Sequence, residues 1–131
     1  DIFSGEMIRE FEPAPADSNS RPEITALVLT PDGKKAVAGY GNSGGEAEYN
    51  SVRVWDINSG ENIISFNKGL KWVTSLAVTP DGRSVLTGEY NSDSVRVYDI
   101  STGNLTRGYK TGGTSAIDIS AGGRYALFGG C

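Results

Sequence analysis

Residues 51–61 read Ser-Val-Arg-Val-Trp-Asp-Ile-Asn-Ser-Gly-Glu, and residues 94–104 read Ser-Val-Arg-Val-Tyr-Asp-Ile-Ser-Thr-Gly-Asn. The alternating valines show the period-2 pattern of a half-buried β-strand. The Asp-x-x-Ser/Thr-Gly that follows contains residues typical of a tight turn. The sequence therefore contains an internal repeat whose unit includes a strand and a turn.

A second duplicated stretch precedes each of these copies. Residues 24–39 read Ile-Thr-Ala-Leu-Val-Leu-Thr-Pro-Asp-Gly-Lys-Lys-Ala-Val-Ala-Gly, and residues 73–88 read Val-Thr-Ser-Leu-Ala-Val-Thr-Pro-Asp-Gly-Arg-Ser-Val-Leu-Thr-Gly. A third copy occupies residues 114–129, and residues 1–11 match the end of a unit. Alternating apolar residues predict one strand before the Pro-Asp-Gly turn and a second strand after it.

The repeat has a period close to 43 residues. Asp56 and Asp99 are 43 residues apart, whereas Asp1 and Asp56 are 55 apart. Two insertions of six residues each, within residues 12–23 and 41–50, account for the excess. Each unit thus has room for four short strands, and no segment has the pattern of a helix of about ten residues.

A period near 40–45 residues, with four strands and a Trp-Asp ending the third, resembles the WD40-repeat β-propeller family. Trp55-Asp56 and Tyr98-Asp99 carry the resemblance, which covers essentially the whole chain. It implies an all-β fold of blades with four antiparallel strands each. The Gly-His that usually precedes the first strand of a WD blade is absent, so a WD-like propeller of another subfamily is the alternative.

On this resemblance we expect residues 1–131 to form an incomplete ring. Residues 1–11 would be the fourth strand of a preceding blade, 24–66 and 73–109 two full blades, and 114–131 the first two strands of a further blade. We interpret the chain as a piece of a larger propeller. The alternative is an oligomer in which several copies complete one ring.

Composition excludes several classes of function. The net charge is −4 and the twelve basic residues are scattered, which argues against nucleic-acid binding. No apolar run approaches the roughly 20 residues that span a bilayer. The single cysteine, Cys131, cannot form an internal disulfide, which favours a cytoplasmic protein.

The sequence also argues against catalysis. It contains no histidine, which excludes Ser-His-Asp and Cys-His sites and histidine metal ligands. Residues 39–44 match G-x-G-x-x-G, but the following segment is predicted to be a strand rather than the helix that a nucleotide site needs. Glu46, Glu48 and Asn50 lack the spacing of an EF-hand calcium loop. We therefore predict a protein that is not an enzyme and has no cofactor.

The resemblance also indicates where a partner would bind. In WD propellers, the loops before the first strand and between the second and third share one face, and both insertions fall in such loops. This loop-rich face would present a set of aromatic and acidic side chains: Tyr40, Tyr49, Trp72, Glu89 and Tyr90. Aromatic residues are favoured at the centres of interfaces. Packing between blades is the alternative role for Trp72. Trp55 and Tyr98 end equivalent strands, so both are expected in the core.

We therefore predict a non-catalytic propeller scaffold that binds a protein or peptide, with neither nucleic acid nor membrane as a partner. One alternative is the propeller region of a larger enzyme or signalling protein, which positions or regulates a catalytic domain. Another is the structural oligomer, in which the partner is the rest of the propeller or further copies of the chain. Fold alone does not decide between these functions.

Overall fold

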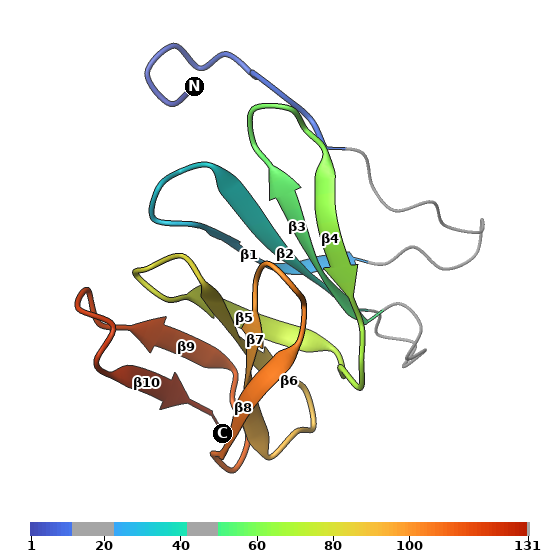
Figure 1. Ribbon diagram of the computed structural model, residues 1–131, viewed down its shortest axis with the longest axis vertical. Helices are drawn as coiled ribbons and strands as arrows, with labels where there is room; N and C mark the ends of the chain where they lie inside the picture. Colours follow the sequence, from blue (N-terminus) through green and yellow to red (C-terminus); the bar gives the residue numbers. More distant parts are fainter. Residues whose placement is uncertain (12–22, 42–49, 131) are drawn as a thin grey trace.

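The computed structural model describes residues 1–11, 23–41 and 50–130, which form β-strands and turns with no helix. The first sheet contains β1 (Glu23–Leu29), β2 (Lys35–Gly41), β3 (Ser51–Asp56) and β4 (Asn62–Phe66). The second contains β5 (Val73–Val78), β6 (Ser84–Glu89), β7 (Ser94–Asp99) and β8 (Leu105–Lys110). The third contains β9 (Ala116–Ile119) and β10 (Ala126–Gly129). The all-β prediction is confirmed, and the two full sheets are antiparallel, with their strands in sequence order (Figure 1).

The first two sheets are close structural copies of each other. Trp55 pairs with Ala36 in the first sheet, and Tyr98 pairs with Val85 in the second. The register shifts immediately before Trp55 and immediately before Tyr98, at the same point of the repeat. The sequence repeat is therefore also a repeat of pairing register.

The Thr-Pro-Asp-Gly turns have the same hydrogen bonds in both sheets. In the first, the Thr30 amide donates to the Lys35 carbonyl and the Gly33 amide donates to the Thr30 carbonyl, each over 2.9 Å. Gly33 has a φ of 69° and its counterpart Gly82 a φ of 71°. Glycine adopts this left-handed conformation without the steric cost that other residues incur. The turn chemistry therefore explains why the first two strands of each unit form a hairpin.

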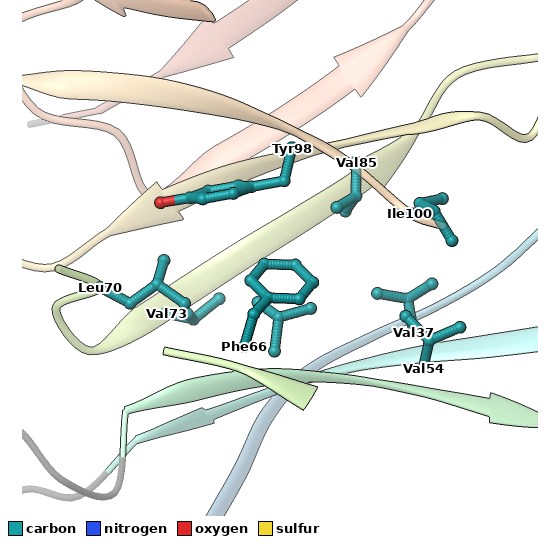
Figure 2. Packing of buried hydrophobic residues seen from close by; sticks show 9 residues of the cluster. Val37, Val54, Phe66, Leu70, Val73, Val85, Tyr98 and Ile100 are labelled. Atoms are coloured by element: carbon teal, nitrogen blue, oxygen red, sulfur yellow. The ribbon is translucent and has the colours of Figure 1, made fainter. Parts of the chain in front are cut away.

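The main core lies between the first and second sheets, which pack face to face (Figures 1 and 2). The ring of Tyr98 is 1% exposed and its centroid lies 5.0 Å from that of Phe66. Trp55 is 8% exposed, so the predicted burial of both residues that end a third strand is confirmed. The apolar residues of this cluster are Val37, Val52, Val54, Phe66, Leu70, Val73, Val85, Tyr98 and Ile100.

Successive sheets meet along their first strands, because β1 packs against β5 and β5 packs against β9. The Thr25 hydroxyl donates to the carbonyl of Val73, and the Thr74 hydroxyl donates over 3.2 Å to the carbonyl of Thr114. Gly39 permits this approach, since a Cβ there would lie 2.6 Å from Val73 Cγ1. The second sheet is thus joined to the third in the way that the first is joined to the second.

Residues 1–11, predicted as a fourth strand, form no strand and pair with none of the described strands. The segment instead contacts the first sheet through two side chains. Arg9 donates to the carbonyls of Asn58 and Ser59, and the Phe11 ring lies 5.7 Å from that of Trp55. A strand requires a hydrogen-bonded neighbour, and the described residues offer none beside this segment.

Candidate partner-binding groove

A groove of about 690 Å³ lies where three loops of the second and third sheets meet. These loops precede β5, join β6 to β7 and precede β9, so they share one end of the antiparallel sheets. The groove is lined by residues of these three loops and of the strands beside them: Lys71, Thr74, Glu89, Tyr90, Asn91, Ser92, Asp93, Gly112, Gly113, Thr114 and Ser115. The volume lies within the range of about 300–1,000 Å³ that is usual for ligand sites.

Tyr90 lines this groove, and the ring of Trp72, which is not part of the lining, packs against the Tyr90 ring. The centroids of Trp72 and Tyr90 are 5.5 Å apart and the rings are tilted by 47°. Trp72 is half-buried, whereas Tyr90 is 63% exposed. This is the tilted geometry that aromatic pairs favour, so Trp72 supports the Tyr90 ring and leaves it accessible to a partner.

Hydrogen bonds to both neighbouring loops fix the turn from Tyr90 to Asp93. The Tyr90 amide donates to the Trp72 carbonyl over 2.7 Å, and the Asp93 carbonyl accepts from the Thr111 amide over 2.7 Å. The Lys71 ammonium donates to the carbonyl of Asn91, a residue with a φ of 53°. The groove is therefore preformed, which reduces the entropy that binding would cost.

Glu89 lies at the base of the groove but does not present its carboxylate to solvent. The residue is 1% exposed. Its carboxylate accepts from the Lys71 amide over 2.8 Å and from the Thr87 hydroxyl over 3.1 Å, and it pairs with Arg96 at 3.4 Å. A buried carboxylate needs such partners. Glu89 was predicted as a side chain presented on the loop-rich face, but it is buried at the base of the groove, where it fixes the loop before β5.

Tyr40 occupies the position of Glu89 in the first sheet and is also buried, at 3% exposure. The guanidinium of Arg53, the counterpart of Arg96, lies 4.9 Å from the centroid of the Tyr40 ring. Side chains alternate between the two faces of a strand. Tyr40 and Glu89 therefore lie on the same face of their sheets as the arginine of the adjacent third strand, Arg53 and Arg96 respectively. Of the predicted face residues that the structure describes, only Tyr90 and part of Trp72 are therefore accessible.

The fifth predicted residue, Tyr49, lies outside the described residues, as do most of the two insertions. The groove also includes residues that the sequence did not single out as binding residues: Asn91, Gly112, Gly113 and Thr114. Asn91 is next to Tyr90 in the chain, whereas the position of Gly112, Gly113 and Thr114 beside this turn follows from the packing of the third sheet on the second. A pattern of local residues carries no signal for such a long-range contact.

At the opposite end of the sheets lie short turns whose aspartate carboxylates accept hydrogen bonds from hydroxyl and amide groups of the same turn. The Thr30 hydroxyl donates to Asp32 over 2.6 Å and the Lys34 amide over 3.0 Å. Both bonds lower the pKa of Asp32, and the bond from the Thr30 hydroxyl has the larger effect. The equivalent bonds from the Thr79 hydroxyl and the Arg83 amide lower the pKa of Asp81. These carboxylates therefore have a structural role in their turns.

The turns after the third strands use their aspartates in the same way. The Ser59 amide donates to Asp56 over 2.8 Å and lowers the pKa of this carboxyl group. The Ser101 hydroxyl and the Thr102 amide donate to Asp99 and lower the pKa of its carboxyl group. Within residues 1–11, 23–41 and 50–130, no three His, Cys, Asp or Glu residues cluster closely enough to hold a metal ion.

The same described ranges contain no helix of the length and apolarity that crossing a bilayer would require. In comparisons with known proteins, neither a family model nor a curated protein matches the chain. Function must therefore be argued from the groove and from the repeat.

Proposed function

We propose that this chain is part of a WD-like β-propeller whose loop-rich end binds a protein or peptide, without catalysing a reaction. The propeller arrangement is supported by the two equivalent bonds, from Thr25 to Val73 and from Thr74 to Thr114. A contact between first strands that repeats from one sheet to the next is what successive blades of a propeller would make. In such a propeller, the loops that precede these first strands would gather near the central channel.

The observation that carries the binding role is the exposed Tyr90 ring beside a preformed groove. Tyrosine buries a large area at a small entropic cost and is enriched among the residues that dominate binding energy. The turn that holds Tyr90 is bonded to both neighbouring loops, so the ring is presented on a rigid support. In the short turns at the opposite end, by contrast, the polar groups already bond one another.

The charges around the groove favour a polar or mixed partner. Lys71 and Asp93 both line it, and the Lys71 ammonium is held by the Asn91 carbonyl. A peptide with a central apolar or aromatic residue flanked by charges of both signs would match this lining. Ionic contacts at such a rim mainly accelerate association, so we expect added salt to slow binding.

Selection of peptides from a displayed library against the intact chain tests this proposal. We expect the selected peptides to lose about fivefold or more in affinity on Tyr90→Ala, since a loss of about 1 kcal/mol or more is typical of a hot spot. Arg83→Glu, at the turn-rich end, is the control and should change affinity less than twofold. Peptides that respond to Arg83→Glu and not to Tyr90→Ala would move the site to the other end and refute the assignment.

A further inference from the structure

The loops that form the groove differ in sequence from their counterparts at the joint between the first and second sheets. The threonine bonds that join successive sheets end at the carbonyls of Val73 and Thr114, which therefore occupy equivalent positions. The residues immediately before them are Trp72 and Gly113. The indole ring carried by the loop before β5 is thus replaced by a glycine in the loop before β9.

At the joint between the first and second sheets, a glycine accepts this indole ring. A Cβ at Gly41, the last residue of β2, would overlap Trp72 Cδ1, so the ring packs directly on the backbone there. Only glycine permits so close an approach. Tyr90 occupies the position of Gly41 in the second sheet, since each lies two residues after the glycine that accepts the first-strand threonine bond. Ring and glycine have therefore exchanged places between the two loops.

This exchange leaves glycine backbone accessible on one side of the groove. Gly112 and Gly113 have φ angles of 77° and 100°, and a Cβ at Gly112 would meet nothing within 4 Å. On the other loop, the Tyr90 ring packs on Trp72 and is 63% exposed. The groove thus combines a backbone surface without side chains and an accessible aromatic ring, which together suit a planar side chain.

The groove lining also contains an acceptor for an indole N–H group. Asp93 lines the groove, and its Oδ1 accepts a hydrogen bond from the Ser94 hydroxyl over 3.0 Å. A carboxylate has two oxygens with about four acceptor sites, so it can accept a further bond. A buried indole N–H usually has such a partner. Tryptophan would therefore use both the surfaces and the acceptor of the groove, whereas phenylalanine would use the surfaces alone.

We infer that the groove takes a tryptophan side chain of the bound peptide. Its ring lies between Tyr90 and the backbone of Gly112 and Gly113, and its N–H donates to the Asp93 carboxylate. The inference rests on the proposed binding role of this end of the sheets and adds the residue that anchors the peptide. Tryptophan is enriched among the residues that dominate binding energy. The packing of Trp72 on Gly41 provides an example of the same indole–glycine contact within the molecule.

The probe is N-acetyl-L-tryptophanamide, a single residue with blocked termini, added to the full isotope-labelled chain. Amide chemical shifts of residues 90–93 and 112–115 should change saturably, with a dissociation constant on the order of millimolar, as expected for so small a ligand. N-acetyl-L-leucinamide, whose side chain is apolar but not planar, is the control. It should bind about fivefold more weakly at these residues, or more weakly still.

Two exposed tyrosines provide matched variants of the chain. Tyr90 is 63% exposed and lines the groove, whereas Tyr125 is 67% exposed and does not line it. Tyr90→Ala should weaken binding of the tryptophan probe about fivefold or more, because one wall of the site is lost. Tyr125→Ala should change the affinity less than about twofold.

The hydrogen bond to Asp93 is tested by removing either partner. The 1-methyl derivative of the probe lacks the indole N–H, and Asp93→Ala lacks the acceptor. Each change alone should weaken binding about threefold or more. Combined, they should weaken it little further, because both remove the same bond. Losses that multiply would show that the N–H donates elsewhere.

Several results would overturn the inference. They are shift changes spread over the chain without saturation at the groove, equal affinity for the leucine probe, and equal losses in Tyr90→Ala and Tyr125→Ala. If Tyr90→Ala does not fold, the leucine and 1-methyl probes still decide the outcome, since they need no variant.

The peptide selection separates this inference from the proposed function. Selected peptides that depend on Tyr90 but share no tryptophan would refute the inference and leave the groove as the binding site. Peptides that bind equally well to Tyr90→Ala would refute both. We expect peptides that depend on Tyr90, share a tryptophan at one position, and lose about fivefold or more in affinity when this tryptophan is replaced by leucine.

Discussion

Replacement of Glu89 by alanine tests the buried network beneath the groove. The substitution removes the acceptor of two hydrogen bonds, from the Lys71 amide and the Thr87 hydroxyl, and the ion pair with Arg96. Hydrogen bonds to charged groups contribute about 1.5–3 kcal/mol each, and breaking a buried ion pair costs about 3–5 kcal/mol. These figures describe the same interactions, so they are not added together.

The position of Arg96 sets the expected loss at the lower end. Its side chain is 26% exposed, and it keeps a 2.6 Å bond to the Gly69 carbonyl after the carboxylate is removed. We therefore expect Glu89→Ala to lower the free energy of unfolding by about 3 kcal/mol. In urea denaturation followed by circular dichroism, the midpoint should fall by roughly 1–3 M.

The first sheet supplies a rescue variant. There, Tyr40 and Ala38 occupy the positions of Glu89 and Thr87, and the arginine lies over a ring instead of beside a carboxylate. Thr87→Ala combined with Glu89→Tyr should recover about half of the loss, because a desolvated cation–π contact contributes about 2 kcal/mol. A loss below about 1 kcal/mol for Glu89→Ala, or no recovery in the double variant, would refute the reasoning.

Three other predictions concern the core, the turns and the joint between sheets. Trp55→Ala should lower the free energy of unfolding by about 3–5 kcal/mol; a loss below about 1 kcal/mol in urea denaturation would contradict the repeat alignment. Because hydrogen bonds from Thr30 and Ser59 lower the pKa of Asp32 and of Asp56 in the folded state, their stabilisation is present above the unfolded pKa of about 3.9 and is lost as pH falls through the folded pKa. Asp56→Asn should therefore reduce the dependence of thermal stability on pH between about 2 and 4, whereas an unchanged pH profile would count against this role. Gly39→Ala should cost about 1–3 kcal/mol by overpacking against Val73, and a thermal melting temperature equal to that of the parent chain would show that the sheets do not meet closely there.

The sequence predicted the strands well because their signal is local. The alternating valines around Arg53 and Arg96, and the Pro-Asp-Gly turns, determine the strand, the turn and the pairing of neighbours in the chain. The order of strands within each sheet then follows from short connections. Trp55 and Tyr98 were correctly placed in the core from their equivalent positions in the repeat, and Phe11 and Phe66 pack against their rings.

The accessibility of the side chains on the loop-rich face was predicted less well because burial depends on contacts between units. Tyr40 and Glu89 lie near the end of the second strand of their sheets. At that point the sequence alone does not distinguish a solvent-facing side chain from one that contacts an arginine of the third strand. Residues 1–11 were predicted to be a fourth strand because they match the end of a repeat unit, but they have no described neighbour with which to pair. In both cases, the missing information is which surfaces lie next to each other in space.

The threonine joints between sheets bear on how such a chain can change during evolution. Thr25 and Thr74 each donate to a backbone carbonyl, an acceptor that every residue type provides. The acceptor residues, Val73 and Thr114, differ without loss of the bond. The hydrogen bond of the joint therefore places no requirement on the side chain of the acceptor residue, so duplication or exchange of a unit preserves this bond.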